Sequence, residues 1–243
     1  MQNYIMIGAG GTGTHLLAAL HAYLAAHHKD DEWMLFILDG DVVEEKNLER
    51  QLFYPGMITV NKAEAAASAL FDIPHVRAYA EYLSEENIGR FIQDRDIVLI
   101  CADNMVVRKR IEDHVKTLDN AVVINGGNEK HSGSVQLYVR RDGADVTPRI
   151  GYLHPEVTAE GADRAEMTCA QAAALPGGEQ TIIANMQSAT WMLTALWRYD
   201  NDLYELAECS DPSPATWTEL QFDAWDGTVE HIDMRMSSRW RTA

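Results

Sequence analysis

Short apolar runs alternate with segments of helical periodicity along the first 140 residues. Runs that are apolar at nearly every position predict strands buried on both faces, at residues 4–7, 34–38, 97–101 and 122–124. A shorter strand is predicted at 75–80. Helical patterns lie between these runs, at residues 14–28, 62–70 and 105–117, with a further helix opening at the N-cap Ser84. The alternation predicts an α/β fold, a doubly wound, Rossmann-like and mainly parallel sheet.

The pattern changes after residue 140. Residues 134–139 alternate between apolar and polar side chains, as an antiparallel strand with one polar face does, whereas residues 140–178 have no clear period. A gap of that size favours a functional loop. A long helix is predicted at 180–198, and a hairpin through Trp225-Asp226-Gly227 joins strands at 218–222 and 229–234. We therefore expect antiparallel strands toward the C-terminus of a single domain, 1–243, divided into a nucleotide-binding core (3–140), a crossover loop (141–179) and a C-terminal part (180–243).

Charge and composition exclude several classes of protein. The 243 residues contain 20 Lys+Arg and 37 Asp+Glu, a formal net charge of −17, which disfavours binding to nucleic acid or to an anionic membrane. No apolar run approaches the ~18 residues of a membrane span. The three cysteines form no CxxC pair, so we expect no zinc site. The chain enters its first strand without a signal peptide, and a cytoplasmic location is the expectation.

A glycine-rich loop follows the first strand and opens the first helix. Glycines at these positions let the backbone approach a nucleotide and direct N–H groups toward phosphate; they are Gly8, Gly10, Gly11 and Gly13. The next strand ends at Asp39, whose carboxylate can accept hydrogen bonds from ribose hydroxyls. A tight turn without a ligand remains the alternative, and a dehydrogenase is equally compatible with these features.

The segment after Asp39 separates these alternatives. Residues 39–51 combine two acids, an Asn-Leu pair and an Arg-Gln pair at fixed spacing, and this segment resembles the signature of the ubiquitin-activating-enzyme-like superfamily, the ThiF/MoeB/HesA adenylating enzymes. Further matches follow in the same order: Lys62 at a helix start, residues 96–104 with Arg108, residues 125–127 and residues 133–135. The resemblance extends over about residues 3–200.

The resemblance implies an ATP-dependent adenylyltransferase that activates the C-terminal carboxylate of a small ubiquitin-like or sulfur-carrier protein or peptide. It also implies ATP and Mg²⁺ at the site and a homodimer. The implied nucleotide-binding residues are the four glycines with Asp39, Asp41, Asn47, Arg50, Gln51, Lys62 and Asn104. Among them Asp39 suits the ribose, Asn47 the triphosphate, and Arg50 and Lys62 the phosphate oxygens, while Asp103 suits Mg²⁺. Taken alone, Lys62 would be an ordinary solvated lysine.

Cys169 is the candidate nucleophile, since the family's thioester-forming members carry their cysteine in this crossover region. A thiolate there would attack the acyl-adenylate and form a thioester with the partner. An inert loop cysteine is the equally weighted alternative. Cys101 lies within an apolar strand and is expected to be a core thiol. Cys209 is a loop residue for which the sequence indicates no bonding partner.

The sequence also departs from the family. The two zinc-binding CxxC pairs of many bacterial members are absent, and so is an N-terminal helix whose arginine enters the neighbouring subunit's site. Four arginines are candidate replacements, with ordinary surface positions as the alternative: Arg140, Arg141, Arg149 and Arg164. Two other functions remain open, a catalytically silent partner-binding subunit and an NAD-dependent oxidoreductase. The sequence leaves open which carrier is activated and what becomes of its carboxylate.

Overall fold

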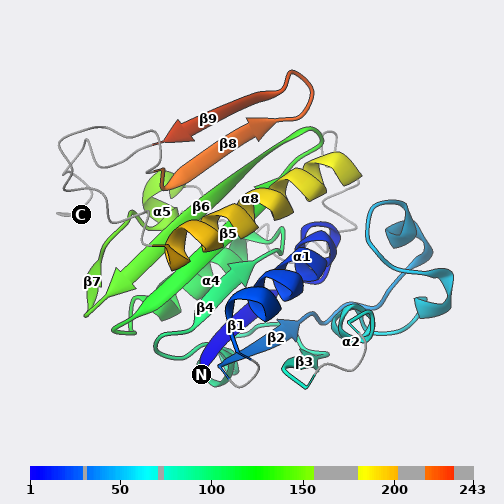
Figure 1. The fold of residues 1–243 in the computed structure, drawn as a ribbon, viewed down its shortest axis with the longest axis horizontal. Helices are drawn as coiled ribbons and strands as arrows, with labels where there is room; N and C mark the ends of the chain where they lie inside the picture. The colour runs from blue at the N-terminus through cyan, green and yellow to red at the C-terminus, as the bar shows by residue number, and fades with distance from the viewer. Residues whose placement is uncertain (30–31, 71–73, 156–179, 202–216, 233–243) are drawn as a thin grey trace.

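One mixed β-sheet organises the chain (Figure 1). The structure, a computed structural model, describes residues 1–29, 32–70, 74–155, 180–201 and 217–232. Within these residues nine strands form a sheet in the order β3-β2-β1-β4-β5-β6-β8-β9, with β7 paired to β6. The strands are β1 (Gln2–Ile7), β2 (Trp33–Leu38), β3 (Val76–Tyr79), β4 (Ile97–Ile100), β5 (Ala121–Asn128), β6 (Ser132–Arg141), β7 (Ala144–Asp145), β8 (Glu219–Asp223) and β9 (Thr228–Ile232).

The first five strands are parallel and doubly wound. β1 pairs with β2 on one side and with β4 on the other, in registers that place Ile7 beside Leu38 and beside Ile100. Strand order therefore reverses at β1, and the loops after β1 and β4 leave the sheet side by side. In open α/β sheets this reversal forms the crevice in which ligands bind. The predicted Rossmann-like fold is confirmed.

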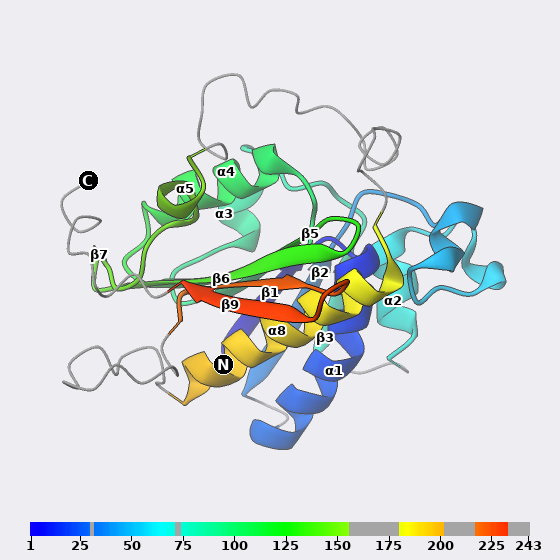
Figure 2. The ribbon, with the colours of Figure 1, turned by 90° about the horizontal axis from the view of Figure 1, so that it is seen from above.

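Helices cover both faces of the sheet (Figure 2). α1, α2 and α8 lie on one face, here called the α1 face, and α3, α4 and α5 lie on the other, the α4 face. Their bounds are α1 (Gly11–His27), α2 (Lys62–Ser68), α3 (Ile88–Phe91), α4 (Met105–Val115), α5 (Ile150–Leu153) and α8 (Ile182–Asp200), and short 3-10 turns occupy η1 (Glu45–Glu49) and η2 (Pro55–Met57).

Burial on both faces explains the apolar runs. In β1, Tyr4 and Met6 pack into the core of the α1 face, whereas Ile5 and Ile7 pack into the core of the α4 face. Alternate side chains of a strand point to opposite faces, so a strand covered on both sides must be apolar at every position. The same rule accounts for the run in β4.

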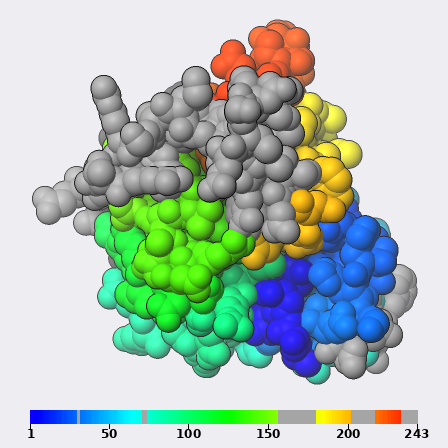
Figure 3. All heavy atoms as spheres, turned by 60° about the vertical axis from the view of Figure 1, so that its left-hand side comes forward, coloured from blue at the N-terminus to red at the C-terminus, as the bar shows by residue number. Residues whose placement is uncertain are grey.

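The C-terminal half of the sheet is antiparallel, as expected. β6 pairs antiparallel with β5 and β8, and β8 forms a hairpin with β9. Gly227 supplies the positive φ of +77° in the hairpin turn, a conformation that glycine adopts without strain. In the space-filling view of Figure 3 the orange-red β8–β9 hairpin lies at the top of the molecule, above the yellow residues of α8.

Three local expectations are corrected. The strand predicted at 122–124 is longer and continues through the glycines to Asn128, where it still pairs with β6. Gly126 allows close packing there, because a Cβ at this position would lie 2.3 Å from Met192 Sδ of α8. The helix expected from Ser84 begins at Ile88, since Asn87 Oδ1 accepts a hydrogen bond from Ser84 N and closes a turn first. The region expected as a loop after residue 140 contains β7 and α5.

No helix in the described ranges is both long and apolar enough to cross a membrane. The longest, α8, carries Arg198 and Asp200 in its last turn and packs against α1. It is therefore a core helix of the α1 face.

Two positions on α8 test the packing of this face. Leu196 is fully buried, and Leu196→Ala is expected to lower the free energy of unfolding by about 2–5 kcal/mol through lost burial and a residual cavity. Ile183 on the same helix is 52% exposed, so Ile183→Ala should change the free energy of unfolding by no more than about 0.5 kcal/mol. Urea denaturation of both variants measures the difference, and equal losses would contradict the packing described.

Candidate active site

The predicted glycine loop lies where strand order reverses. Gly8 has φ +96°, and a Cβ there would lie 2.9 Å from Ala102 N in the loop after β4. A Cβ on Gly13 would lie 2.2 Å from Gly8 O. α1 begins at Gly11, after the N-cap Gly10, which provides no side-chain cap. The first N–H groups of α1 thus have no side-chain acceptor from the N-cap, which is the arrangement that suits an anionic ligand.

Asp39 ties the loops after β1 and β2 together. Its Oδ2 accepts a hydrogen bond from Ala9 N at 2.7 Å, and its Oδ1 accepts one from Asp41 N at 2.9 Å. Burial raises the pKa of Asp39 above its ordinary value, although the two N–H groups and the nearby charge of Lys62 oppose that rise. The predicted ribose acceptor is therefore held firmly at the glycine loop.

Lys62 is buried and paired with Asp41. Its Nζ lies 2.8 Å from Asp41 Oδ2, and its side chain is 7% exposed. Asn61 positions this lysine, because its Oδ1 caps α2 while its Nδ2 donates to the carbonyls of Asp39 and Asp41. The Tyr82 hydroxyl also donates to Asp41. Burial raises the pKa of Asp41, but the hydrogen bonds from Lys62 and Tyr82 outweigh it and bring this pKa below its usual value.

The η1 turn places the other predicted residues of this segment. Asn47 is buried, and its Oδ1 accepts a hydrogen bond from Glu44 N in a capping box, so its side chain shapes the turn. Gln51 is buried beside the glycine loop, with its Nε2 3.8 Å from a Cβ built on Gly10. Gln51 Oε1 has no hydrogen-bond partner among the described residues, which leaves a buried acceptor for a donor from a ligand.

Asp103 and Asn104 stand at the end of β4. The Asp103 side chain is 49% exposed, and its Oδ1 lies 3.8 Å from Arg108 Nη2. Asn104 is the N-cap of α4, and its Oδ1 accepts from Val106 N and Val107 N. That oxygen is therefore engaged in the cap. Burial lowers the pKa of Arg108, and the charge of Asp103 opposes the change.

Gln180 connects the two predicted catalytic side chains Arg50 and Asp103. Its Oε1 accepts a hydrogen bond from Arg50 Nη1, and its Nε2 donates to Asp103 Oδ2 at 3.1 Å. Sequence reasoning missed Gln180, because no motif surrounds it and its two partners are 130 and 77 residues away. It also missed Asn61 as the residue that positions Lys62, although an asparagine before a helix start is a recognisable N-cap signal.

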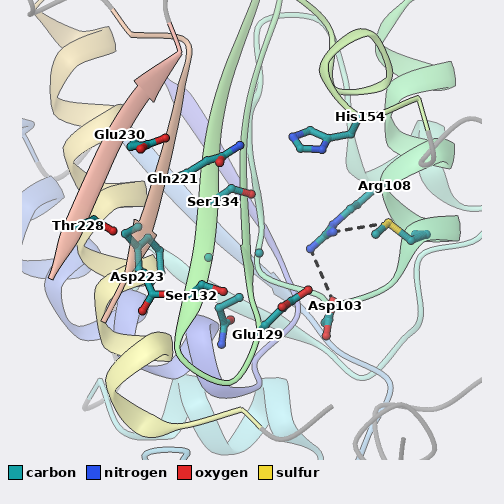
Figure 4. A pocket seen from close by; sticks show the side chains of 15 residues that line it. Asp103, Arg108, Glu129, Ser132, Ser134, His154, Gln221, Asp223, Thr228 and Glu230 are labelled. Carbon is teal, nitrogen blue, oxygen red and sulfur yellow. Dashed lines mark hydrogen bonds and ion pairs between the residues drawn. The ribbon is translucent and has the colours of Figure 1, made fainter. Parts of the chain in front are cut away.

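A cavity of about 500 Å³ adjoins Asp103 (Figure 4). Arg108 and His154 face it from one side, and the side chains of Gln221 and Glu230 face it from the β8–β9 hairpin. Its lining mixes polar, acidic and glycine residues from α4, the β5–β6 connection and the hairpin. This lining includes Glu129, Ser132, Ser134, Asp223 and Thr228.

A buried polar network borders this cavity. Glu219, which is 1% exposed, lies 3.0 Å from His154 Nε2 and accepts a hydrogen bond from Gln221 Nε2 at 3.0 Å. Gln136 Nε2 lies 2.9 Å from His154 Nε2. Burial raises the pKa of Glu219, but the bonds from His154 and Gln221 outweigh it and leave this pKa below its usual value. The sequence did not predict that Glu219 takes part in this network, because a glutamate at an alternating position of a strand is usually exposed to solvent.

The cysteine and arginine expectations are resolved in part. Cys101 is buried with a free thiol, as expected, and burial raises the pKa of that thiol. Cys169, Cys209 and Arg164 lie outside the described residues. Arg140 and Arg149 both pair with Asp145, and β6 places Arg140 opposite Ala121, at the edge of the sheet remote from the glycine loop. In the described part of the chain, no three His, Cys, Asp or Glu side chains form a metal-binding group.

The raised pKa of Asp39 predicts a pH dependence of stability. Between the usual aspartate pKa of about 3.8 and the raised value, folded Asp39 binds a proton that unfolded Asp39 has lost, so its contribution to stability declines as pH rises. The free energy of unfolding of wild type minus that of Asp39→Asn should therefore fall from pH 4 upward, by at most about 1.4 kcal/mol per pH unit. Urea denaturation across this range measures it.

Asp113→Asn, on α4 and outside the contacts of Asp39, is the control for this measurement. Hydrogen bonds from Lys109 and Lys116 lower the pKa of Asp113, so its contribution is lost only as pH falls through the usual aspartate value and below it. The free energy of unfolding of wild type minus that of Asp113→Asn should stay nearly flat over the pH range in which the difference for Asp39→Asn falls. A flat profile for Asp39→Asn as well would contradict the environment assigned to Asp39.

Characterised proteins resemble this chain over about half of its length. It is 32% identical over 138 residues to the adenylyltransferase and sulfurtransferase UBA4 of Eremothecium gossypii, an alignment of 55% of this chain and 29% of that protein. It is 31% identical over 141 residues to the molybdopterin-synthase adenylyltransferase of Haemophilus influenzae, covering 55% and 54% of the two chains. The chain thus spans about half or less of these relatives.

Solved structures share the fold over almost the whole chain. E. coli MccB crystallised with ATP superposes with a TM-score of 0.68 at 15% identity, over 96% of this chain and 64% of that chain. PaaA superposes with a TM-score of 0.65 at 17% identity, over 96% and 64%. A model of the ThiF family matches residues 2–238. The resemblance inferred from the segment after Asp39 is confirmed, and the chain belongs to the ThiF family.

Proposed function

We propose that this protein is an ATP-dependent adenylyltransferase that activates the C-terminal carboxylate of a small carrier protein or peptide. One observation carries the proposal: Gln180 joins Arg50 and Asp103, the predicted phosphate and magnesium residues, beside the glycine loop and next to a cavity. The names of the relatives, UBA4 and the molybdopterin-synthase adenylyltransferase, support the same reaction. An NAD-dependent oxidoreductase transfers a hydride and does not require the charges of Arg50 and Asp103 at a reacting phosphate.

In the proposed reaction a carboxylate oxygen of the partner attacks the α-phosphorus of ATP. A new oxygen–phosphorus bond forms, the bond between the α-phosphorus and its bridging oxygen breaks, and pyrophosphate leaves with the electron pair. Negative charge grows on the phosphates during this step, and preorganised cations lower its cost. Arg50 and Lys62 are the proposed cations, while Asp39 accepts from the ribose hydroxyls and the start of α1 donates to phosphate.

Asp103 is the proposed ligand for Mg²⁺. Magnesium in nucleotide sites is usually held by one or two carboxylates together with substrate phosphates and water. Asp103 fits this pattern, since its carboxylate is half exposed and its Oδ2 is bonded to a neutral amide rather than to a close cation. The ion would supply positive charge at the phosphates.

We propose that the carrier's C-terminal segment enters the cavity beside Asp103. Arg108 lines this cavity, and its Nη2 lies 3.8 Å from Asp103 Oδ1, a long ion-pair distance, so the guanidinium suits the incoming carboxylate. Besides Asp103, three carboxylates line the same space, those of Glu129, Asp223 and Glu230. They favour a segment with a basic side chain before its terminal carboxylate. We also propose a homodimer in the cytoplasm, and a hydrodynamic mass tests the dimer.

Pyrophosphate exchange tests the reaction. With ATP, Mg²⁺ and a panel of peptides that differ at the C-terminal residue, the protein should incorporate labelled pyrophosphate into ATP, whereas the same peptides with C-terminal amides should not support exchange. Asp103→Asn should reduce the exchange rate by about 10²-fold or more, because the charge at the phosphates is lost.

Asp113→Asn is the control for that substitution. Asp113 pairs with Lys109 and Lys116 on the exposed side of α4, so its loss should leave exchange unchanged. ATP binding without exchange for any peptide or carrier would contradict adenylation and favour the catalytically silent partner-binding subunit.

Cys169 remains a proposed nucleophile. Its thiolate would attack the acyl carbonyl of the adenylate, a carbon–sulfur bond would form and AMP would leave. Cys169→Ala should then abolish a thiol-sensitive adduct with the activated peptide while pyrophosphate exchange continues. Cys209→Ala should keep the adduct, and an adduct that survives Cys169→Ala would remove Cys169 from the mechanism.

A further inference from the structure

The side chain of Gln180 occupies contacts that the proposed reaction needs for its substrate. Arg50 Nη1 donates to Gln180 Oε1, and Gln180 Nε2 donates to Asp103 Oδ2 at 3.1 Å and to Asn128 O at 3.3 Å. A guanidinium only donates and a carboxylate only accepts, so a primary amide is a neutral group that satisfies both at once. A magnesium-bound triphosphate satisfies the same two groups with charges, an anionic oxygen for Arg50 and a cation for Asp103.

The backbone that follows Gln180 is fixed by other contacts. Thr181 caps α8, and its hydroxyl donates to Lys130 O at 2.8 Å. Asn185 is fully buried, and its Oδ1 accepts from Asn128 Nδ2 at 2.8 Å. Thr12 Oγ1 in turn donates to Asn128 Oδ1 at 2.9 Å. The start of α8 is therefore held against the glycine loop, and the Gln180 side chain is the part that is free to rotate away.

The segments that carry Arg50 and Asp103 are likewise held without Gln180. His15 Nε2 contacts Arg50 O at 3.3 Å, and Arg50 N donates to Asn47 O at 3.3 Å. Cys101 N donates to Ile7 O at 2.8 Å, and Asn104 caps α4. Removing the amide of Gln180 therefore frees the two charged groups without displacing them.

We propose that the Gln180 side chain competes with the nucleotide: it bridges Arg50 and Asp103 in the nucleotide-free protein and is displaced when a magnesium-bound triphosphate takes both contacts. The inference rests on the proposed function, since it requires that ATP bind here. Each binding event breaks two hydrogen bonds to charged groups. The apparent affinity is reduced by the fraction of molecules in which the bridge is closed.

Calorimetric titration of the full chain with ATP and Mg²⁺ tests the bridge. Gln180→Ala removes the competition and should lower the dissociation constant by about five- to tenfold, given the usual strength of hydrogen bonds to charged groups. Gln180→Glu should raise it, because a carboxylate binds Arg50 more strongly and adds negative charge beside the phosphates. Adenosine has no phosphate to open the bridge, so its dissociation constant should be the same for wild type and Gln180→Ala. Thr190→Ala on the exposed side of α8 is the control and should match wild type throughout.

The possible results of the titration show whether the bridge alone or also the proposed function is wrong. Weaker or unchanged ATP binding by Gln180→Ala, in a chain whose wild type binds ATP, overturns the bridge and leaves the proposed function standing. An equal gain in adenosine affinity also overturns it, since the change would then not act at the phosphates. A wild type that binds neither ATP nor adenosine overturns the proposed function and this inference together.

Discussion

The two hydrogen bonds to the Asp39 carboxylate hold the candidate site together. One comes from Ala9 in the loop after β1 and the other from Asp41 in the loop after β2. Through Asp41 the arrangement extends to Lys62, which is buried against that carboxylate. A buried acid costs free energy unless its hydrogen bonds are made, and here the donors that satisfy it also fix the geometry of the nucleotide loops. Placement of the site thus follows from satisfying one carboxylate.

Close approach of α8 is the second constraint. Cβ atoms built on Gly11 and Gly126 would lie 2.2 Å from Asn185 Nδ2 and 2.3 Å from Met192 Sδ, both on this helix. Gly11 at the start of α1 and Gly126 in β5 therefore let α8 pack closely over α1 and β5. Because α8 sits this close, Gln180, which directly precedes the N-cap Thr181, can reach across to Arg50 and Asp103.

The sequence predicted what depends on local or periodic signals. Apolar runs identified β1, β2 and β4, since a strand covered on both faces must be apolar throughout, and Trp225-Asp226-Gly227 identified the hairpin. Sequence-based prediction failed where the role of a residue depends on a contact with a residue far along the chain. The predicted strand stopped at Ile124, because no local signal shows that the glycine at 126 makes room for Met192 of α8. Gln180, with partners far along the chain, has no local pattern from which its bridge could be inferred.

The buried cations of the site are each placed near a carboxylate. Two of its cations are almost completely buried, with 7% and 8% of the side chains of Lys62 and Arg108 exposed. A buried cation without a counter-charge is costly, and each of these lies near one carboxylate, that of Asp41 or Asp103. In a protein of net charge −17, this local pairing leaves little free positive charge for a triphosphate. In the proposed reaction, Lys62 would exchange its carboxylate partner Asp41 for phosphate, and a cation at Asp103 would balance that exchange electrostatically.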